Sequence, residues 1–232
     1  MTEHEELLML RALVEKQKKE KNSMIKNVIF DLDGTLWDTS GIVVDIWNEV
    51  LSEKCPSLIM TKEIMSSLMG KNKAQFMDDF FVGIEKTEAE RLIMEIFSHE
   101  QEYLRHHGAS MYDGVIDTLN VLKENYKLAI VSNCQSGYLD AFLTHYNLKD
   151  MLTDYICAGS SPLTKGENIN LVINRNEIDR AIFVGDTKSD MEAAQLAHIP
   201  FVYASYGFGE VDRCDAVIEK FVDIIDVAEK LM

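Results

Sequence analysis

The sequence is poor in cysteine and proline and has no long apolar run, and each shortage excludes a class of protein. Of its 232 residues, 3 are proline and 4 are cysteine. The cysteines form no C-x-x-C pair, which excludes a zinc knuckle and a small disulfide framework. They are Cys55, Cys134, Cys157 and Cys214. No apolar stretch reaches the roughly 20 residues that a membrane span needs. We therefore expect a cytoplasmic protein in a reducing compartment, with no membrane partner.

Positive charge is also scarce. The chain carries 23 Lys and Arg against 39 Asp and Glu, a formal net charge of −16. A field of this sign repels a polyanion, so we expect no nucleic-acid partner. The first six residues are acidic, where a secretory signal would be basic. The hydrophobic share of 47% is that of an ordinary globular protein.

Hydrophobic periodicity divides the chain into an α/β part and an all-helical part. Val28-Ile29-Phe30 is a short apolar run, typical of a strand buried on both faces. From Gly41 to Gly108 the pattern is helical, and it predicts helices at 41–54, 61–69, 73–82 and 87–107. Thr87 to Glu90 is read as a capping box that begins the last of these helices.

After Gly114 predicted helices and strands alternate. The strands are expected at 128–132, 155–158, 181–184, 201–204 and 216–218. The helices are expected at 115–125, 137–146, 166–176, 189–198 and 221–231. This alternation predicts a parallel sheet with helices on both faces, a Rossmann-like α/β core.

The all-helical block therefore interrupts the α/β domain just after its first strand. We expect an α/β core domain at 25–38 and 109–232, and an inserted helical domain at 39–108. Residues 1–24 form a predicted N-terminal helical extension, in which 5–21 has one apolar face.

Three of the predicted strands end in polar residues. Asp31 and Asp33 follow the first strand, Ser132-Asn133 ends the second, and Asp186 ends the fourth, with Asp190 shortly after it. Because ligands bind beyond the carboxyl ends of parallel strands, these side chains are expected in one crevice. Four converging carboxylates repel one another unless a cation is present, and Mg²⁺ suits oxygen ligands best.

These residues carry a resemblance. Asp31-Leu32-Asp33-Gly34-Thr35-Leu36, Ser132-Asn133, Lys165 and Gly185-Asp186-Thr187-Lys188-Ser189-Asp190 resemble the four motifs of the haloacid dehalogenase-like superfamily, in the right order. The match runs from about Val28 to the C-terminus. The helical insertion resembles the cap domain of the phosphoglycolate phosphatase-like branch.

The resemblance implies an enzyme that hydrolyses phosphoric monoesters. Asp31 would attack phosphorus and form an aspartyl-phosphate, which water then hydrolyses. Asp33 would protonate the leaving alkoxide and later deprotonate the attacking water. Lys165 would stabilise the charge of the transition state. A cap that closes over the site would exclude bulk water.

The resemblance also implies metal and phosphate ligands. Mg²⁺ would be held by Asp31, by the backbone carbonyl of Asp33 and by Asp186. Asp190 would not bind the metal directly but would orient metal-bound water or Lys165. The Ser132 hydroxyl and the backbone amides of Asn133 and Gly34 would bind phosphate oxygens.

Other branches of the superfamily fit less well. The dehalogenase and phosphonatase branches lack the second aspartate, and P-type ion pumps carry Thr in place of Asp33 together with membrane helices. The β-phosphoglucomutase branch shares the first motif and the cap type. It usually has Glu where this chain has Gly185, which favours a phosphatase.

Three functions remain open. The first is a Mg²⁺-dependent phosphatase acting on a small phosphorylated metabolite, and the second is a sugar phosphomutase using the same aspartyl-phosphate. The third is a low-activity binding or regulatory module, supported only by the N-terminal segment. Phosphoglycolate, a sugar phosphate, a nucleotide and pyrophosphate are all open as substrates, and both a monomer and a homodimer are open.

Some motifs also have purely structural interpretations. Asp190 is well placed to cap the helix at 189–198. Trp37 is interpreted as packing at the junction with the insertion, and Gly207-Phe208-Gly209 as a turn. His99, His106 and His107 are interpreted as helix residues and not as metal ligands.

Overall fold

A computed structural model of the chain describes residues 24–68, 71 and 73–232. The predicted helix at 5–21, and with it the predicted N-terminal extension apart from residue 24, lies outside the described residues. Within them, no helix is long and apolar enough to cross a bilayer.

The core of the molecule is one six-stranded sheet in which every strand pairing is parallel, with the order β5-β4-β1-β6-β7-β8. The strands are β1 Lys26–Phe30, β4 Lys127–Ser132, β5 Asp154–Cys157, β6 Arg180–Gly185, β7 Phe201–Ala204 and β8 Ala216–Ile218. All six predicted strands are confirmed, with ends shifted by two residues at most. The central strand β1 is buried on both faces, because Val28, Ile29 and Phe30 are each fully buried.

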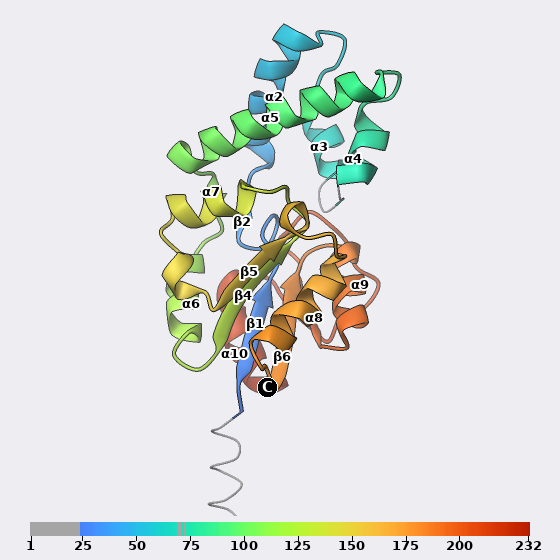
Figure 1. Cartoon of the computed structure of the whole chain (residues 1–232). Helices are drawn as coiled ribbons and strands as arrows, with labels where there is room; N and C mark the ends of the chain where they lie inside the picture. The colour runs from blue at the N-terminus through green and yellow to red at the C-terminus, as the bar shows by residue number, and fades with distance from the viewer. Residues whose placement is uncertain (1–23, 69–70, 72) are drawn as a thin grey trace, which may run out of the picture.

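Helices cover both faces of this sheet, as the alternating pattern predicts (Figure 1). On one face lie α6 Val115–Leu122, α7 Tyr138–His145 and α10 Ile224–Leu231. On the other lie α8 Lys165–Arg175 and α9 Lys188–Ala197. The predicted helix at 221–231 begins as a 3₁₀ turn at Phe221–Asp223 before α10. The Rossmann-like α/β fold is therefore confirmed.

The all-helical block lies at the end of the sheet where the strands finish (Figure 1). Its helices are α2 Ser40–Lys54, α3 Lys62–Leu68, α4 Lys73–Phe80 and α5 Lys86–His107. It has a hydrophobic core of its own, with Trp47, Leu51 and Leu92 among its most buried members. Helix α5 crosses above α7 and packs against it, so the block contacts the sheet domain through its longest helix (Figure 1).

Two local predictions are wrong or incomplete. Helix α5 begins at Lys86, and its cap is Glu85, whose carboxylate accepts the amides of Thr87 and Glu88 at 3.0 and 3.2 Å. The predicted capping box over Thr87 to Glu90 is therefore wrong, because the helix has already begun at Lys86 with Glu85 as its N-cap.

The second difference is a pair of strands that periodicity does not reveal. β2 Trp37–Asp38 and β3 Ser110–Met111 are antiparallel, with Trp37 opposite Met111 and Asp38 opposite Ser110. Two residues are too few for an alternating pattern. The pair ties together the two points at which the chain passes between the sheet domain and the helical block.

Candidate active site

The polar strand ends do meet at one edge of the sheet. β1 lies between β4 and β6, so Asp31, Ser132 and Asp186 end three adjacent strands. The Asp31 amide donates to the carbonyl of Val184 at 2.8 Å, which extends the β1–β6 pairing up to the site. Lys165 is the first residue of α8 and lies at the same edge.

Three buried carboxylates and one lysine form the centre of the site. Oxygen atoms of Asp31, Asp186 and Asp190 all lie within 4.8 Å of one another. The ammonium of Lys165 lies 2.6 Å from Oδ1 of Asp31 and also pairs with Oδ1 of Asp190. All four side chains are at most 5% exposed, so these charges interact with little screening by solvent.

Burial and crowding change the proton affinity of these groups. Burial, reinforced by Asp190 and opposed by Lys165, raises the pKa of Asp31 to about 7. Burial and the charges of Asp190 and Asp31 raise the pKa of Asp186 to about 8. Burial alone would lower the pKa of Lys165, but Asp190 and Asp31 outweigh it and raise that pKa above its ordinary value. The lysine therefore stays charged, but its single positive charge does not neutralise both Asp31 and Asp186.

Asp190 has both of its oxygens engaged. Oδ1 pairs with Lys165, and Oδ2 accepts the Thr187 hydroxyl at 2.6 Å and the amides of Thr187 and Asp186 at 2.9 and 3.2 Å. Thr187 is the N-cap of α9, and it forms a reciprocal capping box with Asp190. The interpretation of Asp190 as part of a helix cap is confirmed, and the same side chain also orients Lys165.

Asp186 is held by two residues, Phe208 and Thr35, for which the sequence pattern predicted no role at the site. Its Oδ2 accepts the Phe208 amide at 2.7 Å, and its Oδ1 is 3.4 Å from the Thr35 hydroxyl. The turn at 207–209 thus wraps over Asp186, and a Cβ on Gly207 would lie 2.3 Å from Cβ of Asp186. The predicted turn is confirmed, and only a glycine fits its closest approach.

Gly34 leaves room for the same carboxylate. Its φ of +80° is a conformation that favours glycine, and an added Cβ would lie 2.2 Å from Oδ2 of Asp186. Its amide, which the resemblance assigns to phosphate, donates to the carbonyl of Trp37 at 2.9 Å. The structure therefore gives Gly34 a steric role, and phosphate binding by its amide would require that hydrogen bond to break.

Asp33 lies outside the group of three carboxylates, and three donors hold one of its oxygens. Oδ1 accepts the Trp37 indole at 2.9 Å, the Thr39 hydroxyl at 3.1 Å and the Tyr138 hydroxyl at 2.7 Å. Burial raises the pKa of Asp33 above its usual range, and these bonds oppose that rise. Trp37 is fully buried and packs edge-on against Tyr138 and Phe142, so its predicted packing at the junction is confirmed.

Ser132 and Asn133 lie where the strand pattern expects them, at the end of β4 beside β1. The Ser132 side chain is buried, and its oxygen accepts the Cys134 amide at 3.3 Å. The side-chain amide nitrogen of Asn133 lies 3.4 Å from the hydroxyl of Ser189, at the start of α9. Their role in binding phosphate stays a prediction.

Glu100 is a buried carboxyl that the sequence reasoning missed. It lies on α5 and accepts the side-chain amide of Gln135 at 2.6 Å and the indole of Trp47 at 3.4 Å. Burial, together with the charge of Asp33, raises the pKa of Glu100 to about 8. A signal was available, because Glu100 occupies the same helical stripe as the buried Ile93, Phe97 and Leu104.

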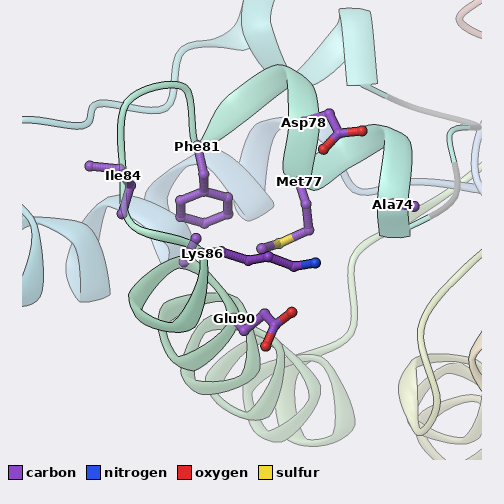
Figure 2. Close-up of a pocket in the computed structure, with 8 residues that line it drawn as sticks. Ala74, Met77, Asp78, Phe81, Ile84, Lys86 and Glu90 are labelled. Carbon is purple, nitrogen blue, oxygen red and sulfur yellow. The ribbon is translucent and has the colours of Figure 1, made fainter.

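The helical block also contains a hollow of ≈ 570 Å³ between α4 and the start of α5 (Figure 2). Met77, Phe81 and Ile84 form an apolar wall, with Lys86 and Glu90 beside it. None of the clustered aspartates lines this hollow. It is therefore separate from the chemistry at the strand ends.

The acidic cluster fits a hard divalent cation. It offers only oxygen ligands, and such an ion would remove the repulsion that raises the pKa of Asp31 and Asp186. Among the residues that the structure describes, no other group of three His, Cys, Asp or Glu side chains is arranged for a metal. His99 and His106 lie beside Glu49 and Glu102 instead.

Comparisons with known proteins identify relatives. The family model described as haloacid dehalogenase-like hydrolase matches residues 28–204. The pyrophosphatase PpaX of Listeria welshimeri is 28% identical over 180 residues, which is 75% of this chain and 80% of that protein. The phosphoglycolate phosphatase of Photobacterium profundum is 23% identical over 223 residues, covering 88% of this chain and 96% of that one.

Solved structures share the fold. The crystal structure of a predicted phosphoglycolate phosphatase from Haemophilus somnus has a TM-score of 0.78 at 20% identity, covering 88% of this chain and 97% of that one. A β-phosphoglucomutase from Clostridium difficile has a TM-score of 0.70 at 16% identity, covering 89% of this chain and 98% of that one. At such identities the likeness extends to the fold alone.

Proposed function

Because the chain belongs to the haloacid dehalogenase-like hydrolase family, we propose that it is a Mg²⁺-dependent phosphatase that hydrolyses a small phosphate monoester through an aspartyl-phosphate on Asp31. The observation that carries the proposal is the arrangement of Asp31. Its carboxylate lies beside the Lys165 ammonium, while Asp33, two residues later, is held apart by neutral donors. One aspartate is thus set up to attack and the other to transfer a proton.

The nucleophile must be ionised. Its pKa of about 7 is that of the protein without a metal, and Lys165 already favours the charged form. Mg²⁺ held by Asp31, Asp186 and the backbone carbonyl of Asp33 would supply positive charge between carboxylate and phosphate. Lys165, kept in place by Asp190, would stabilise the charge spread over the phosphoryl oxygens.

Asp33 would act as general acid and then general base. Its Oδ1 is occupied by three hydrogen bonds, so Oδ2 is the oxygen left to carry the proton. A pKa raised by burial suits an acid that must be protonated when the leaving group departs. The ionised form that remains would then take a proton from the attacking water.

The Ser132 hydroxyl and the backbone amides of Asn133 and Gly34 are proposed to bind phosphate oxygens, the Gly34 amide after releasing the Trp37 carbonyl. We further propose that 39–108 is a cap domain over a core of 25–38 and 109–232, with 1–24 as an extension. The separate hydrophobic core of the helical block supports this division. Closure of such a cap would keep water from the aspartyl-phosphate.

We also propose that the protein is cytoplasmic, because four scattered cysteines without a C-x-x-C pair suit a reducing compartment.

Gly185 favours a phosphatase over a phosphomutase. A Cβ at this position would lie 2.5 Å from Cβ of Asp190, so a glutamate could not be accommodated without moving Asp190. The names of the relatives direct the choice of substrates to test, namely phosphoglycolate and pyrophosphate, with sugar phosphates and nucleotides beside them.

The test measures phosphate release from these compounds with Mg²⁺ and with a chelator. Wild-type protein and Asp226→Asn, which changes an exposed aspartate on α10, should release phosphate only with the metal. Asp31→Asn should be inactive while keeping its thermal unfolding transition. Full activity of Asp31→Asn would contradict the mechanism, and turnover that requires a sugar bisphosphate would indicate the mutase.

A further inference from the structure

Two of the four cysteines lie at the edge of the sheet where the parallel strands end, beside Ser132 and Asn133. Cys134 follows β4 by two residues, and Cys157 is the last residue of β5. β4 and β5 are paired in parallel with Ser132 opposite Cys157, so both thiols emerge at the same edge. Cys55 ends α2 and Cys214 is exposed in the loop before β8, both remote in sequence from this edge.

The two thiols are in contact. The loops that carry them are tied together by the backbone, and each thiol changes the pKa of the other. The amide of Gly159 donates to the carbonyl of Cys134 at 3.1 Å, and the Cys157 sulfur lies 3.7 Å from the carbonyl of Gln135. A Cβ on Gly159 would lie 1.9 Å from the Ser136 nitrogen, so the two loops approach as closely as backbones can.

The two sulfurs differ in acidity. The hydrogen bond from Cys134, with others from Ser160 and the Gly159 backbone, lowers the pKa of Cys157 to about 6. Burial raises the pKa of Cys134 well above its ordinary value. Cys157 is therefore the more acidic thiol of the two, which is the arrangement of a reactive cysteine and its resolving partner.

A small oxidant has a way to the reactive sulfur. A pocket of ≈ 170 Å³ is lined by Cys157, Ser136, Gly137, Tyr155 and Ser160, among others. Cys157 is 5% exposed, which protects it from bulky reagents but leaves it at the wall of this pocket.

We propose that Cys134 and Cys157 form a reversible disulfide in response to a peroxide, and that the disulfide disables the loop that binds phosphate. The Cys157 thiolate attacks one peroxide oxygen, the O–O bond breaks, and protonation releases water and leaves a sulfenic acid. The Cys134 sulfur then attacks the sulfenic sulfur, forming the S–S bond and releasing a second water. Two thiols are thus oxidised by two electrons and the peroxide is reduced to two waters. A dithiol reductant reverses the step.

We expect the disulfide to shift the loop that follows β4. The bond brings the sulfurs to about 2 Å, closer than any hydrogen-bonded pair of thiols. Cys134 is adjacent to Asn133, and its amide donates to the Ser132 oxygen at 3.3 Å, so the displacement reaches both residues. A misplacement of about 1 Å in a catalytic site costs about 100-fold in rate. This consequence rests on the proposed function, in which Ser132 and Asn133 bind phosphate.

The experiment exposes the reduced full-length protein to hydrogen peroxide in modest excess. Peptide mapping should find a Cys134–Cys157 cross-link, with the loss of two of the four titratable thiols. Phosphate release should fall at least tenfold and return after dithiothreitol. Cys157→Ser and Cys134→Ser should keep their activity under peroxide, whereas Cys55→Ser and Cys214→Ser should respond as the wild type does.

Several outcomes would overturn the inference. These are a cross-link that involves other cysteines, no cross-link at all, or a Cys134–Cys157 cross-link that leaves activity unchanged. Mapping of the wild-type protein decides the cross-link even if a variant fails to fold. A protein without phosphatase activity on any substrate would contradict the proposed function instead, and the cross-link would still be scored by its mass.

Discussion

The hydroxyl of Tyr138 provides the sharpest test of how Asp33 works. It donates to Oδ1 of Asp33 at 2.7 Å, although the two residues lie 105 positions apart. Tyr138→Phe removes this hydrogen bond, together with the one between the Tyr138 and Thr39 hydroxyls at 3.0 Å, and keeps the ring, which packs edge-on against Trp37 at a centroid distance of 5.5 Å. The perturbation is therefore confined to one hydroxyl.

The magnitude follows from the chemistry of that bond. A hydrogen bond to a charged group contributes about 1.5–3 kcal/mol, which corresponds to roughly 10-fold to 100-fold in rate. Asp33 keeps the Trp37 and Thr39 donors, so we expect the lower end, a kcat about 10-fold lower with KM little changed. Because the lost bond favours the charged carboxylate, the pKa of Asp33 should rise, and its limb of the pH–rate profile should move to higher pH.

The assay is steady-state phosphate release across a pH series, with Tyr146→Phe as matched control. Tyr146 belongs to the same aromatic group around Trp37, but its hydroxyl bonds to the backbone of Ala109 and not to Asp33. Each variant loses the two hydrogen bonds of one hydroxyl, Tyr138 those to Asp33 and Thr39 and Tyr146 those to the carbonyl and the amide of Ala109, so their thermal stabilities should fall by similar amounts. If both show the same kcat and pH profile, Tyr138 has only a structural role and the reasoning about Asp33 is refuted.

Two further predictions concern burial and close approach. Folded protein keeps a proton on Glu100 that the unfolded chain releases above about pH 4.5, so stability falls as pH rises towards about 8. Denaturant unfolding at about pH 5 and about pH 9 should show Glu100→Gln gaining a few kcal/mol on wild type at the higher pH; a difference that does not change with pH would contradict this. Gly34→Ala should destabilise the protein by more than about 1 kcal/mol and abolish Mg²⁺-dependent activity, because its Cβ would meet Asp186 at 2.2 Å. Gly41→Ala, which adds a Cβ in open space at the start of α2, should be neutral or slightly stabilising, and equal effects of the two substitutions would exclude the steric argument.

The sequence alone predicted the six-stranded parallel sheet and the helices on its two faces, but not the short β2–β3 pair. Short apolar runs such as Val28-Ile29-Phe30 are typical of buried strands, and their alternation with amphipathic helices leaves few arrangements besides a parallel sheet covered on both faces. Because parallel strands end at one edge, the sequence also predicted that Asp31, Ser132 and Asp186 meet there. These inferences depend on local pattern and on one topological rule, and both can be read along the chain.

The direction of each side chain was decided by tertiary structure. Asp33 turns towards Tyr138 because α7 brings that hydroxyl to it, and Glu100 is buried because α5 packs on α7. Gly34 is needed because a side chain there would collide with Asp186, and its amide donates a hydrogen bond to the carbonyl of Trp37. Hydrogen bonds and close approaches of this kind join residues tens to hundreds of positions apart. They depend on distances of a few tenths of an ångström, which hydrophobic periodicity does not encode.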